Sequence, residues 1–378
     1  CINARVGGPA LQTSNQSGMN LYIGNVLSRD GTYQPLSPGS QHPEAMREDT
    51  RRLAAGLLAA RSGRPVDAAR LGDGAASGIL WRETLRHVAA SPGRWVRLLL
   101  RKTRLFWSDY EIPDAEGFVV FRQLSALLGL AAVSLGLLAP LATVGLLPAW
   151  RRDRRVTAAL VLLTAATFAS VVTFFVLGRY RLPVVLFLLP LAGCGTSWLV
   201  ELARGRRWRA LHLALLVVLV LMVGSRAPAF PAATRDQHEA ALWFNLGQAG
   251  NRWAGDLLEG AATAITPAQR HQRAVEGAAR AEAATGFLTQ ALRRDHNFFT
   301  ARIERAVAMH RWGSCLLLAG DPRLAAQRYA VALAELDAAL RAVPSWAGPD
   351  LWAQMLALQR AAQRNLAAAR RASPPSPP

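Results

Sequence analysis

The segment Arg179-Tyr180-Arg181-Leu182-Pro183 places two guanidinium groups on either side of a tyrosine. Guanidinium groups bind phosphate oxygens in pairs, so Arg179 and Arg181 are candidate contacts for the phosphate of a lipid. Arginine and tyrosine also anchor helices at a membrane surface without binding a ligand. Phosphate binding and interfacial anchoring are both compatible with this segment.

A second segment, Ser14 to Asn25, alternates amide side chains with small and aromatic residues. Amide groups offer donors and acceptors to hydroxyl groups, and an aromatic ring packs against the apolar face of a sugar. Asn20, Tyr22 and Asn25 are therefore candidate contacts for a sugar or an acceptor molecule. The structural alternative is a turn-rich loop whose asparagines bond their own backbone.

Acidic residues gather in the segment from Trp107 to Asp114. A carboxylate beside a membrane can act as a general base or bind a divalent cation, which is the one cofactor that the sequence suggests. Such residues also cap helices while staying solvated. Glu111 and Asp114 are the candidates, and the sequence gives neither a definite role.

The sequence contains no motif for a nucleotide, a catalytic zinc ion or a serine nucleophile. The patterns G-x-x-x-x-G-K-[ST], G-x-G-x-x-G, H-E-x-x-H and G-x-S-x-G are absent. The 3 cysteines, Cys1, Cys194 and Cys315, have no metal-ligand spacing. The sequence therefore names no metal site and no catalytic residue.

The composition places these segments in a membrane protein. Of 378 residues, 51% are hydrophobic, and 44 basic residues against 25 acidic ones give a net charge of +19. Such a charge suggests nucleic acid, but a soluble nucleic-acid binder is rarely this apolar, and a membrane protein with basic loops fits better. We therefore expect no nucleic-acid partner. Lys102 is the only lysine, so nearly all of the positive charge is arginine.

Four uncharged apolar runs are candidate membrane spans, since a spanning helix needs about 20 residues. They cover residues 124–147, 156–178, 182–200 and 210–225, and the last is the shortest. The loops before the second and fourth runs carry 4 arginines each, whereas the loop at 179–181 carries 2. Positive loops stay cytoplasmic, so we expect the loop at 179–181, residues 1–120 and the chain after 226 to be extracytoplasmic. The basic cluster Arg94–Arg104 argues for the opposite orientation, but it is longer and lies further from the first run, so it is given less weight.

The first 120 residues are expected to begin with an ordered loop region over 1–43. Helices are expected over 44–62, 77–91 and 94–107. The last of these places its arginines on one face, because they are spaced three, four and three residues apart: Arg94, Arg97, Arg101 and Arg104. A basic face beside Trp, Leu and Phe side chains is typical of a helix that lies in the membrane interface.

Residues 237–372 are Ala-rich and helical in pattern, and residues 373–378 form a Pro-rich tail that is expected to be disordered. Trp243, Leu246 and Gly247 match the start of a tetratricopeptide helix pair. Gly320 and the small residues after it match a second pair, and we expect Gly320 to let two helices approach closely. The alternative is an Ala-rich helical bundle without repeats.

In their order and spacing, these segments resemble the C-terminal half of bacterial membrane glycosyltransferases of family 39. This is the protein O-mannosyltransferase-like group with the GT-C fold, and the resemblance covers residues 1–225. It rests on several weak signals, which are Gly18–Asn25 with Asp30-Gly31, Ser77 with Trp81, the basic helix ending in Phe106-Trp107, Glu111–Asp114 and Arg179–Pro183. A tetratricopeptide region follows the membrane part in some such proteins.

The resemblance implies an all-α fold: a multi-pass transmembrane helix bundle with an extracytoplasmic helical subdomain and a C-terminal tetratricopeptide-like α-solenoid. It implies an enzyme of the bacterial inner membrane that transfers a sugar from a polyprenyl-phosphate donor to an extracytoplasmic acceptor. Arg179 and Arg181 would contact the donor phosphate, and Asn20, Tyr22 and Asn25 would lie near the sugar or acceptor. The family's catalytic aspartate lies in a loop upstream of this region. We therefore expect this chain to be an incomplete enzyme, with a lipoprotein that begins at Cys1 as the alternative.

Two further functions are compatible with the pattern of spans and repeats. The chain could be a non-catalytic membrane-anchored tetratricopeptide scaffold that binds a protein partner through its concave face. It could also be a lipid-linked glycan ligase or polymerase. Those enzymes typically carry a large loop, whereas here only a few residues separate the second and third runs.

Overall fold

Helices make up every regular element in the part of the chain that the structure, a computed structural model, describes. The described residues are 16–28, 30–34, 36, 43–114, 117–126, 134–344 and 347–373. The all-α prediction is therefore confirmed for these residues. The chain divides into two units: unit 1 holds Cys1–Asp114 with Ser125–Ala229, and unit 2 holds Ala115–Leu124 with Phe230–Pro378.

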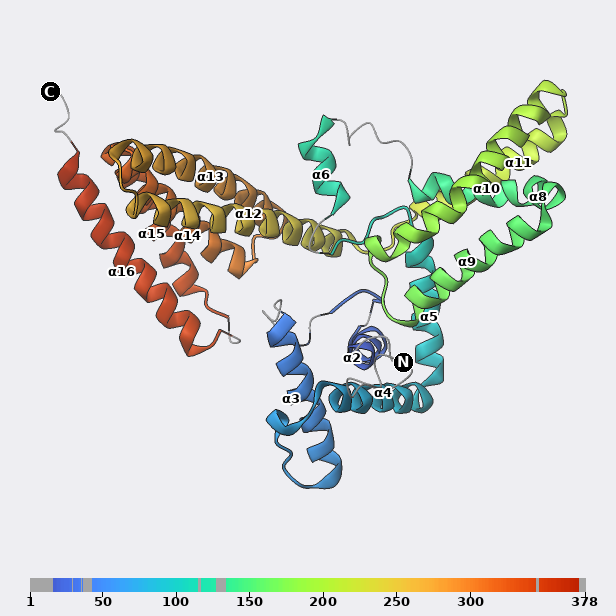
Figure 1. The fold of residues 1–378 in the computed structure, drawn as a ribbon, viewed down its shortest axis with the longest axis horizontal. Coiled ribbons are helices and arrows are strands. Elements are labelled where there is room, and N and C mark those ends of the chain that lie inside the picture. Colours follow the sequence, from blue (N-terminus) through green and yellow to red (C-terminus); the bar gives the residue numbers. More distant parts are fainter. Residues whose placement is uncertain are drawn as a thin grey trace. The chain divides into compact units, whose positions relative to one another are not determined.

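The first half of unit 1 is a group of short and medium helices (Figure 1). These are α2 (Ser17–Tyr22), the π-helical turn η1 (Ile23–Leu27), α3 (Pro43–Ser62), the 3-10 turn η2 (Ala68–Arg70), α4 (Asp73–Ala90) and α5 (Pro92–Trp107). The helices predicted over 44–62, 77–91 and 94–107 are present as α3, α4 and α5. Pro92 starts α5, where its missing N–H costs no hydrogen bond.

The prediction of a loop over residues 1–43 is wrong for residues 17–27, which are helical. Two glycines explain why. A Cβ at Gly18 would lie 1.9 Å from the Ser77 carbonyl oxygen, and one at Gly24 would lie 1.9 Å from that of Phe174. Glycine therefore lets α2 and η1 pack directly against other backbone, and the apolar residues between the two glycines are buried.

The second half of unit 1 contains four apolar helices, α8 (Leu135–Arg152), α9 (Arg154–Thr173), α10 (Gly178–Arg204) and α11 (Trp208–Arg226). Three of these, α9, α10 and α11, are long and apolar enough to cross a membrane. They overlap the predicted runs 156–178, 182–200 and 210–225. The boundary between the first two of these is wrong: residues 174–177 connect α9 to α10, and residues 179–181, predicted as a loop, lie in the first turn of α10. The fourth run is longer than predicted because the helix takes in Trp208, Arg209 and Arg226.

The first predicted span, 124–147, lies partly outside the described residues, which omit 127–133. Residues 135–147 of this run belong to α8, which contains Pro140 and Pro148 and is not one of the three, whereas Leu124 is the last residue of α6. Helix α8 packs closely on α10, because a Cβ at Gly145 would lie 1.9 Å from the Leu191 carbonyl oxygen and one at Gly195 would lie 2.2 Å from that of Leu141. Paired glycines are typical of such close contacts between apolar helices.

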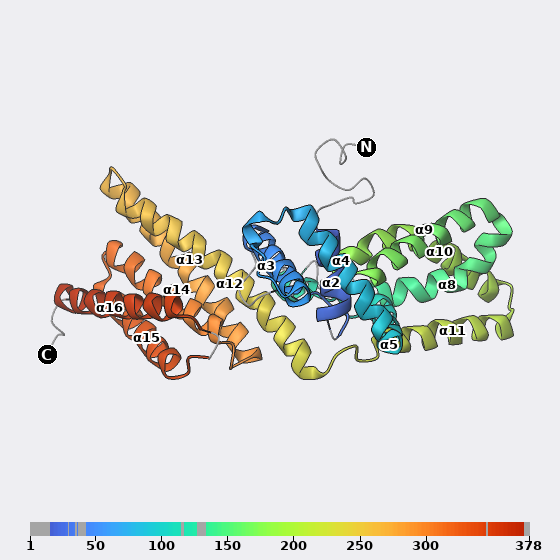
Figure 2. The ribbon, with the colours of Figure 1, turned by 90° about the horizontal axis from the view of Figure 1, so that it is seen from below.

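Unit 2 is a series of long helices in which each packs on the next (Figures 1 and 2). It consists of α6 (Phe118–Leu124), α12 (Ala232–Ala262), α13 (Pro267–Arg294), α14 (Phe299–Leu318), α15 (Pro322–Arg341) and α16 (Pro349–Ala372). Its core is built from small residues facing large ones, as where Gly247 lies against Leu288 and Gly313 against the Tyr329 ring. The last five residues of the predicted tail, 374–378, lie outside the described part.

The close helix approach predicted for Gly320 is wrong, although the position does favour glycine. No heavy atom lies within 4 Å of a Cβ placed there, so Gly320 does not mediate a close helix approach. Its φ of +90° instead places it in the left-handed region just after α14 ends. Glycine is favoured at this position because it reverses the chain without steric cost.

Candidate functional site

The three apolar helices share one end in unit 1, where α9 ends at Thr173, α10 begins at Gly178 and α11 ends at Arg226. We call this region, residues 173–181 and 225–228, the junction. Backbone hydrogen bonds tie distant segments to it: Val176 N–H donates to Gly31 (2.9 Å), Gly178 N–H to Ile112 (2.8 Å) and Asp109 N–H to Ser225 (2.9 Å). Most sequence-predicted site residues lie on these segments.

Asn25 is a buried hydrogen-bonding centre beside the junction. Its Nδ2 donates to the carbonyls of Leu21 and Thr173, both at 2.9 Å. Its Oδ1 accepts from Trp95 Nε1 at 3.2 Å and from Lys102 Nζ at 3.1 Å. An amide has two donors and two lone pairs, so these four bonds use its full capacity. Asn25 therefore joins η1, α5 and α9.

Lys102 reaches the same centre from α5, and its side chain is fully buried at 0% exposure. Its Nζ donates to the Phe174 carbonyl at 2.6 Å as well as to Asn25. Burial lowers the pKa of Lys102 from 10.5 to about 7, because a charged ammonium loses its water inside the protein. The amine therefore titrates near neutral pH.

Arg181 lies in the first turn of α10 with 6% exposure. Its Nη1 donates to the carbonyls of Leu105 (3.2 Å), Phe106 (3.1 Å) and Ser108 (2.7 Å), and its Nη2 donates to that of Tyr110 (2.9 Å). These carbonyls belong to the end of α5 and the chain just after it, where a helix leaves its acceptors without partners. Arg181 thus fixes the end of α5 onto α10.

Arg179 lies two residues earlier in a different environment. Its side chain is 58% exposed, pairs with Asp114 at 2.7 Å and lies over the Tyr180 ring at 5.1 Å from the centroid. Tyr180 contacts Phe175, which in turn contacts Tyr33, so an aromatic row runs beside this arginine. The sequence predicts one role for Arg179 and Arg181. In the structure the two arginines have different partners.

The acidic segment lies along the junction. Asp109 accepts from Gly136 N–H at 3.0 Å and from Arg226 Nε at 3.3 Å. Burial acts to raise the pKa of Asp109, but hydrogen bonds from Ser134, Gly136 and Arg226 outweigh it and lower the pKa. A Cβ at Gly178 would lie 3.1 Å from Glu111 Oε1, so Glu111 packs against the start of α10.

The other amide-segment candidates lie on α2. Tyr22 is buried, and its pKa is raised by burial and then by the charge of Glu83. Asn20 is half-buried and donates its backbone N–H to Gln16. The structure thus brings Asn25, Glu111, Asp114, Arg179 and Arg181 to the junction and its border.

Sequence reasoning missed Lys102 and Trp95, which complete the Asn25 centre. One signal was present: Lys102 is the single lysine in a chain that otherwise uses arginine for its positive charge. A lysine can release its proton when buried, whereas an arginine keeps its charge. The partner Phe174 follows directly after α9 and carries no sequence signal, because it contributes only a carbonyl.

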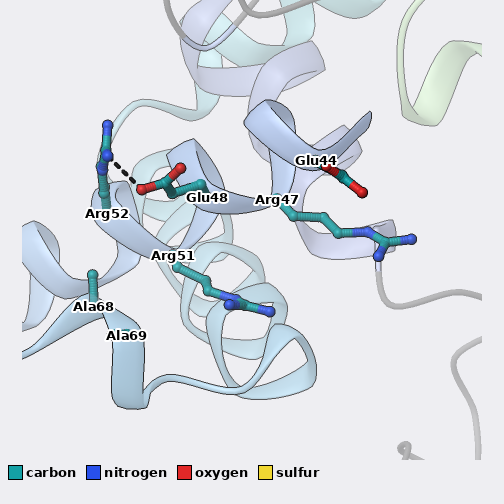
Figure 3. Close-up of a pocket in the computed structure, with 7 residues that line it drawn as sticks. All are labelled: Glu44, Arg47, Glu48, Arg51, Arg52, Ala68 and Ala69. Carbon is teal, nitrogen blue, oxygen red and sulfur yellow. Dashed lines mark hydrogen bonds and ion pairs between the residues drawn. The ribbon is translucent and has the colours of Figure 1, made fainter. Parts of the chain in front are cut away.

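Two surface depressions lie away from the junction. The one in Figure 3, about 380 Å³, is lined by both acidic and basic side chains of α3 together with η2. Arg52 pairs with Glu48, and Arg51 pairs with Asp73 at 2.7 Å, so much of its charge is internally compensated. The second, about 440 Å³, lies in unit 2 beside Arg252 and Arg311. Within the described ranges, no three His, Cys, Asp or Glu side chains are grouped as a metal site.

Comparisons with protein-family models, curated proteins and solved structures found no match to this chain. The geometry of the junction is therefore the basis for a functional assignment.

Proposed function

We propose that this chain is part of a membrane glycosyltransferase that uses a polyprenyl-phosphate sugar donor at the extracytoplasmic face of a bacterial inner membrane. The observation that carries the proposal is Arg179, a guanidinium more than half exposed at the start of a candidate span. An aromatic row lies beside it, Tyr33, Phe175 and Tyr180. A cation next to aromatic rings at the end of an apolar helix fits a sugar phosphate on a lipid.

The chemistry of transfer gives Arg179 its task. When a nucleophile displaces the lipid phosphate at the anomeric carbon, the leaving phosphate gains negative charge. A guanidinium already held in place by Asp114 stabilises that charge without having to reorganise. The base that deprotonates the acceptor hydroxyl is not assigned to any residue of this chain.

The buried cations support a positioning role. Phosphate contact by Arg181, as predicted from the sequence, competes with its four bonds to backbone carbonyls. All four hydrogen bonds of the Asn25 side chain are likewise made within the chain. Its proposed role near the sugar is therefore to hold the shape of the site and not to contact the sugar directly. Asn20 and Tyr22 remain proposed contacts for the sugar or acceptor, and Glu111 remains without a role. These residues would hold the loops around Arg179.

The helices of unit 2 are proposed as a tetratricopeptide-like surface for a protein partner. Support comes from the serial packing of α12 to α16 and from small residues at the helix contacts. A scaffold that lacks transfer activity would use the same surface. That scaffold is the second function, and the following experiment distinguishes it.

The test is photo-crosslinking of the full chain in phospholipid vesicles with a polyprenyl phosphate that carries a diazirine near its phosphate. Wild-type chain should be labelled, and unlabelled polyprenyl phosphate should compete while the corresponding polyprenol should not. Arg179→Gln should weaken labelling by about tenfold, since one charge-assisted hydrogen bond is worth about 1.5–3 kcal/mol. Arg179→Lys should recover part of it, because an ammonium keeps the charge but loses the bidentate geometry.

Arg155→Gln is the matched control, because Arg155 is exposed at the opposite end of α9. It should label like the wild type. Equal labelling of wild type and Arg179→Gln would overturn the phosphate role of Arg179. Absence of labelling in every variant would leave the scaffold function in its place.

A further inference from the structure

Helix α5 carries four arginines on the face that unit 1 leaves open. Lys102, Leu105 and Phe106 are buried on its inner side. The four arginines and the apolar residues between them are exposed on its outer side: Arg94, Val96, Arg97, Leu100, Arg101 and Arg104. Leu100 is 65% exposed and Val96 is 48% exposed.

The position of α5 along the chain's apolar helices is fixed by hydrogen bonds. Lys102 bonds to Phe174 after α9, Arg181 of α10 bonds to the end of α5, and Arg104 donates to the Pro228 carbonyl (2.9 Å) after α11. Each of these contacts lies at the junction. Figures 1 and 2 show that α5 crosses the direction of α9, α10 and α11 there instead of continuing it. If those helices span a bilayer, α5 lies along its surface.

The charges on this face have no carboxylate partner among the described residues. Within the described residues, the ion pairs of unit 1 do not involve Arg94, Arg97, Arg101 or Arg104. The bonds that two of them make go to neutral carbonyls, Gly93 for Arg97 and Pro228 for Arg104. Guanidinium groups with apolar neighbours are complementary to a phosphate-bearing headgroup above acyl chains.

We infer that the outer face of α5 binds the headgroups of anionic phospholipids. Val96 and Leu100 enter the acyl region, and the arginines extend along the surface to reach the phosphates. The inference rests on the membrane-spanning part of the proposed function and is independent of the transfer chemistry. It names a second phosphate-binding surface, one that takes bulk lipid and lies on a different element from Arg179.

The test uses full chain in vesicles of phosphatidylcholine with a minor fraction of phosphatidylglycerol. A Leu100→Cys variant, with the native cysteines replaced by alanine, carries an NBD fluorophore at position 100. Quenching is compared between nitroxide-labelled phosphatidylglycerol and nitroxide-labelled phosphatidylcholine at equal mole fraction. Quenching by the anionic lipid should be at least about twofold stronger than quenching by the neutral lipid, since each arginine near the surface raises the local concentration of anionic lipid several-fold. A quenching ratio of one in this chain would overturn the inference.

Two variants and a salt titration sharpen the result. The triple variant Arg94→Gln/Arg97→Gln/Arg101→Gln, which leaves the Arg104 contact intact, should bring the quenching ratio close to one. The corresponding triple Lys variant should keep most of the preference for the anionic lipid. Arg151→Gln/Arg152→Gln/Arg154→Gln, at the far ends of α8 and α9, should leave it unchanged. High salt should lower the wild-type ratio by screening. A ratio that is insensitive both to salt and to the Gln variant would contradict headgroup binding.

Failure of this inference is distinguishable from failure of the proposed function. An NBD group at position 162, an exposed site within α9, should be quenched by lipids labelled deep in the acyl chain. Deep quenching at position 162 together with a quenching ratio of one at position 100 would contradict headgroup binding by α5 and leave the membrane span intact. Absence of deep quenching at 162 would overturn the membrane span on which both rest.

Discussion

Side-chain cations are held in two different ways in the two units of this protein. At the junction of unit 1, the positive groups of Lys102 and Arg181 donate to backbone carbonyls and an amide. In unit 2, Arg305 pairs with Glu335, and Arg294 pairs with Glu239 at 3.0 Å. Two further arginines of unit 2 lie over tryptophan rings, Arg280 on Trp253 and Arg328 on Trp312.

The difference concerns what remains of the charge. A carboxylate offsets the charge of its partner, and where both groups are largely shielded from solvent, as in Arg305 and Glu335, the pair serves packing between helices. Arg179 also pairs with a carboxylate, but its side chain is more than half exposed and can still meet an anion. A carbonyl satisfies the hydrogen bonds of a cation and leaves its net charge in place. At the junction, Lys102 and Arg181 are therefore hydrogen-bonded to neutral oxygens, whereas the neighbouring Arg179 and Arg226 pair with Asp114 and Asp109.

The largest effect should be the pH dependence that Lys102 gives to stability. Its pKa is about 7 in the folded chain and 10.5 when unperturbed, so the unfolded chain binds more protons between these values. Stability should therefore rise as pH increases from 7 to 10.5, by up to about 4 to 5 kcal/mol at about 1.4 kcal/mol per unit. Lys102→Met should remove this part of the slope in SDS-induced unfolding of the detergent-solubilised chain. Identical slopes in the two proteins would show that Lys102 is not desolvated.

Arg181→Ala should give the next largest effect. It removes the donors for four carbonyls at the end of α5, and the cost should be about 3 kcal/mol after partial rehydration. Thermal melting in detergent measures it. Arg181→Lys should recover part of the loss, since an ammonium still offers three donors. A melting temperature unchanged by Arg181→Ala would contradict the account of how α5 is fixed.

In unit 2, Arg305→Ala should cost about 1 to 2 kcal/mol, because its pair with Glu335 is largely shielded from solvent. The double variant Arg305→Met/Glu335→Leu should restore most of this stability, since both charges then leave together. No such rescue is expected at Arg181, because its partners are backbone carbonyls, which a substitution cannot remove. Urea unfolding of the variants tests the contrast, and a double variant as unstable as the single one would argue against a packing role for this pair.

The smallest effect should be that of Arg179→Gln on stability. Its pair with Asp114 is exposed to solvent on the arginine side, so the loss should be about 0.5 kcal/mol or less. The same variant should strongly weaken crosslinking to polyprenyl phosphate. A large drop in melting temperature would instead identify Arg179 as a structural residue like Arg181.

Local sequence patterns predicted those features that depend on neighbours in the chain. The uncharged runs at 156–178, 182–200 and 210–225 became α9, α10 and α11, because length and apolarity alone make such helices. The arginine face of α5 was also readable, since a helical period of 3.6 residues places spaced residues together. The loop over 17–27 was mispredicted because its helicity depends on Gly18 and Gly24 approaching distant backbone.

The contacts of the candidate site depend on residues far apart in the sequence. Arg181 and the Ser108 carbonyl are 73 residues apart, and Asn25 and the Thr173 carbonyl are 148 apart. Their acceptors are backbone groups, which every residue type provides, so no pattern of side chains marks them. For this reason Arg179 and Arg181 receive one predicted role from their shared motif, whereas their surroundings in the fold differ.

The proposed role of the junction at an extracytoplasmic donor depends on which side of the membrane the junction faces. Single cysteines at positions 180 and 152, in a chain whose native cysteines are replaced by alanine, are to be labelled in intact cells with a membrane-impermeant maleimide. We expect labelling at position 180, beside Arg179, and protection at position 152, at the other end of the apolar helices, until the membrane is permeabilised. Labelling at 152 with protection at 180 would place the junction in the cytoplasm and contradict its proposed role at an extracytoplasmic lipid-linked donor.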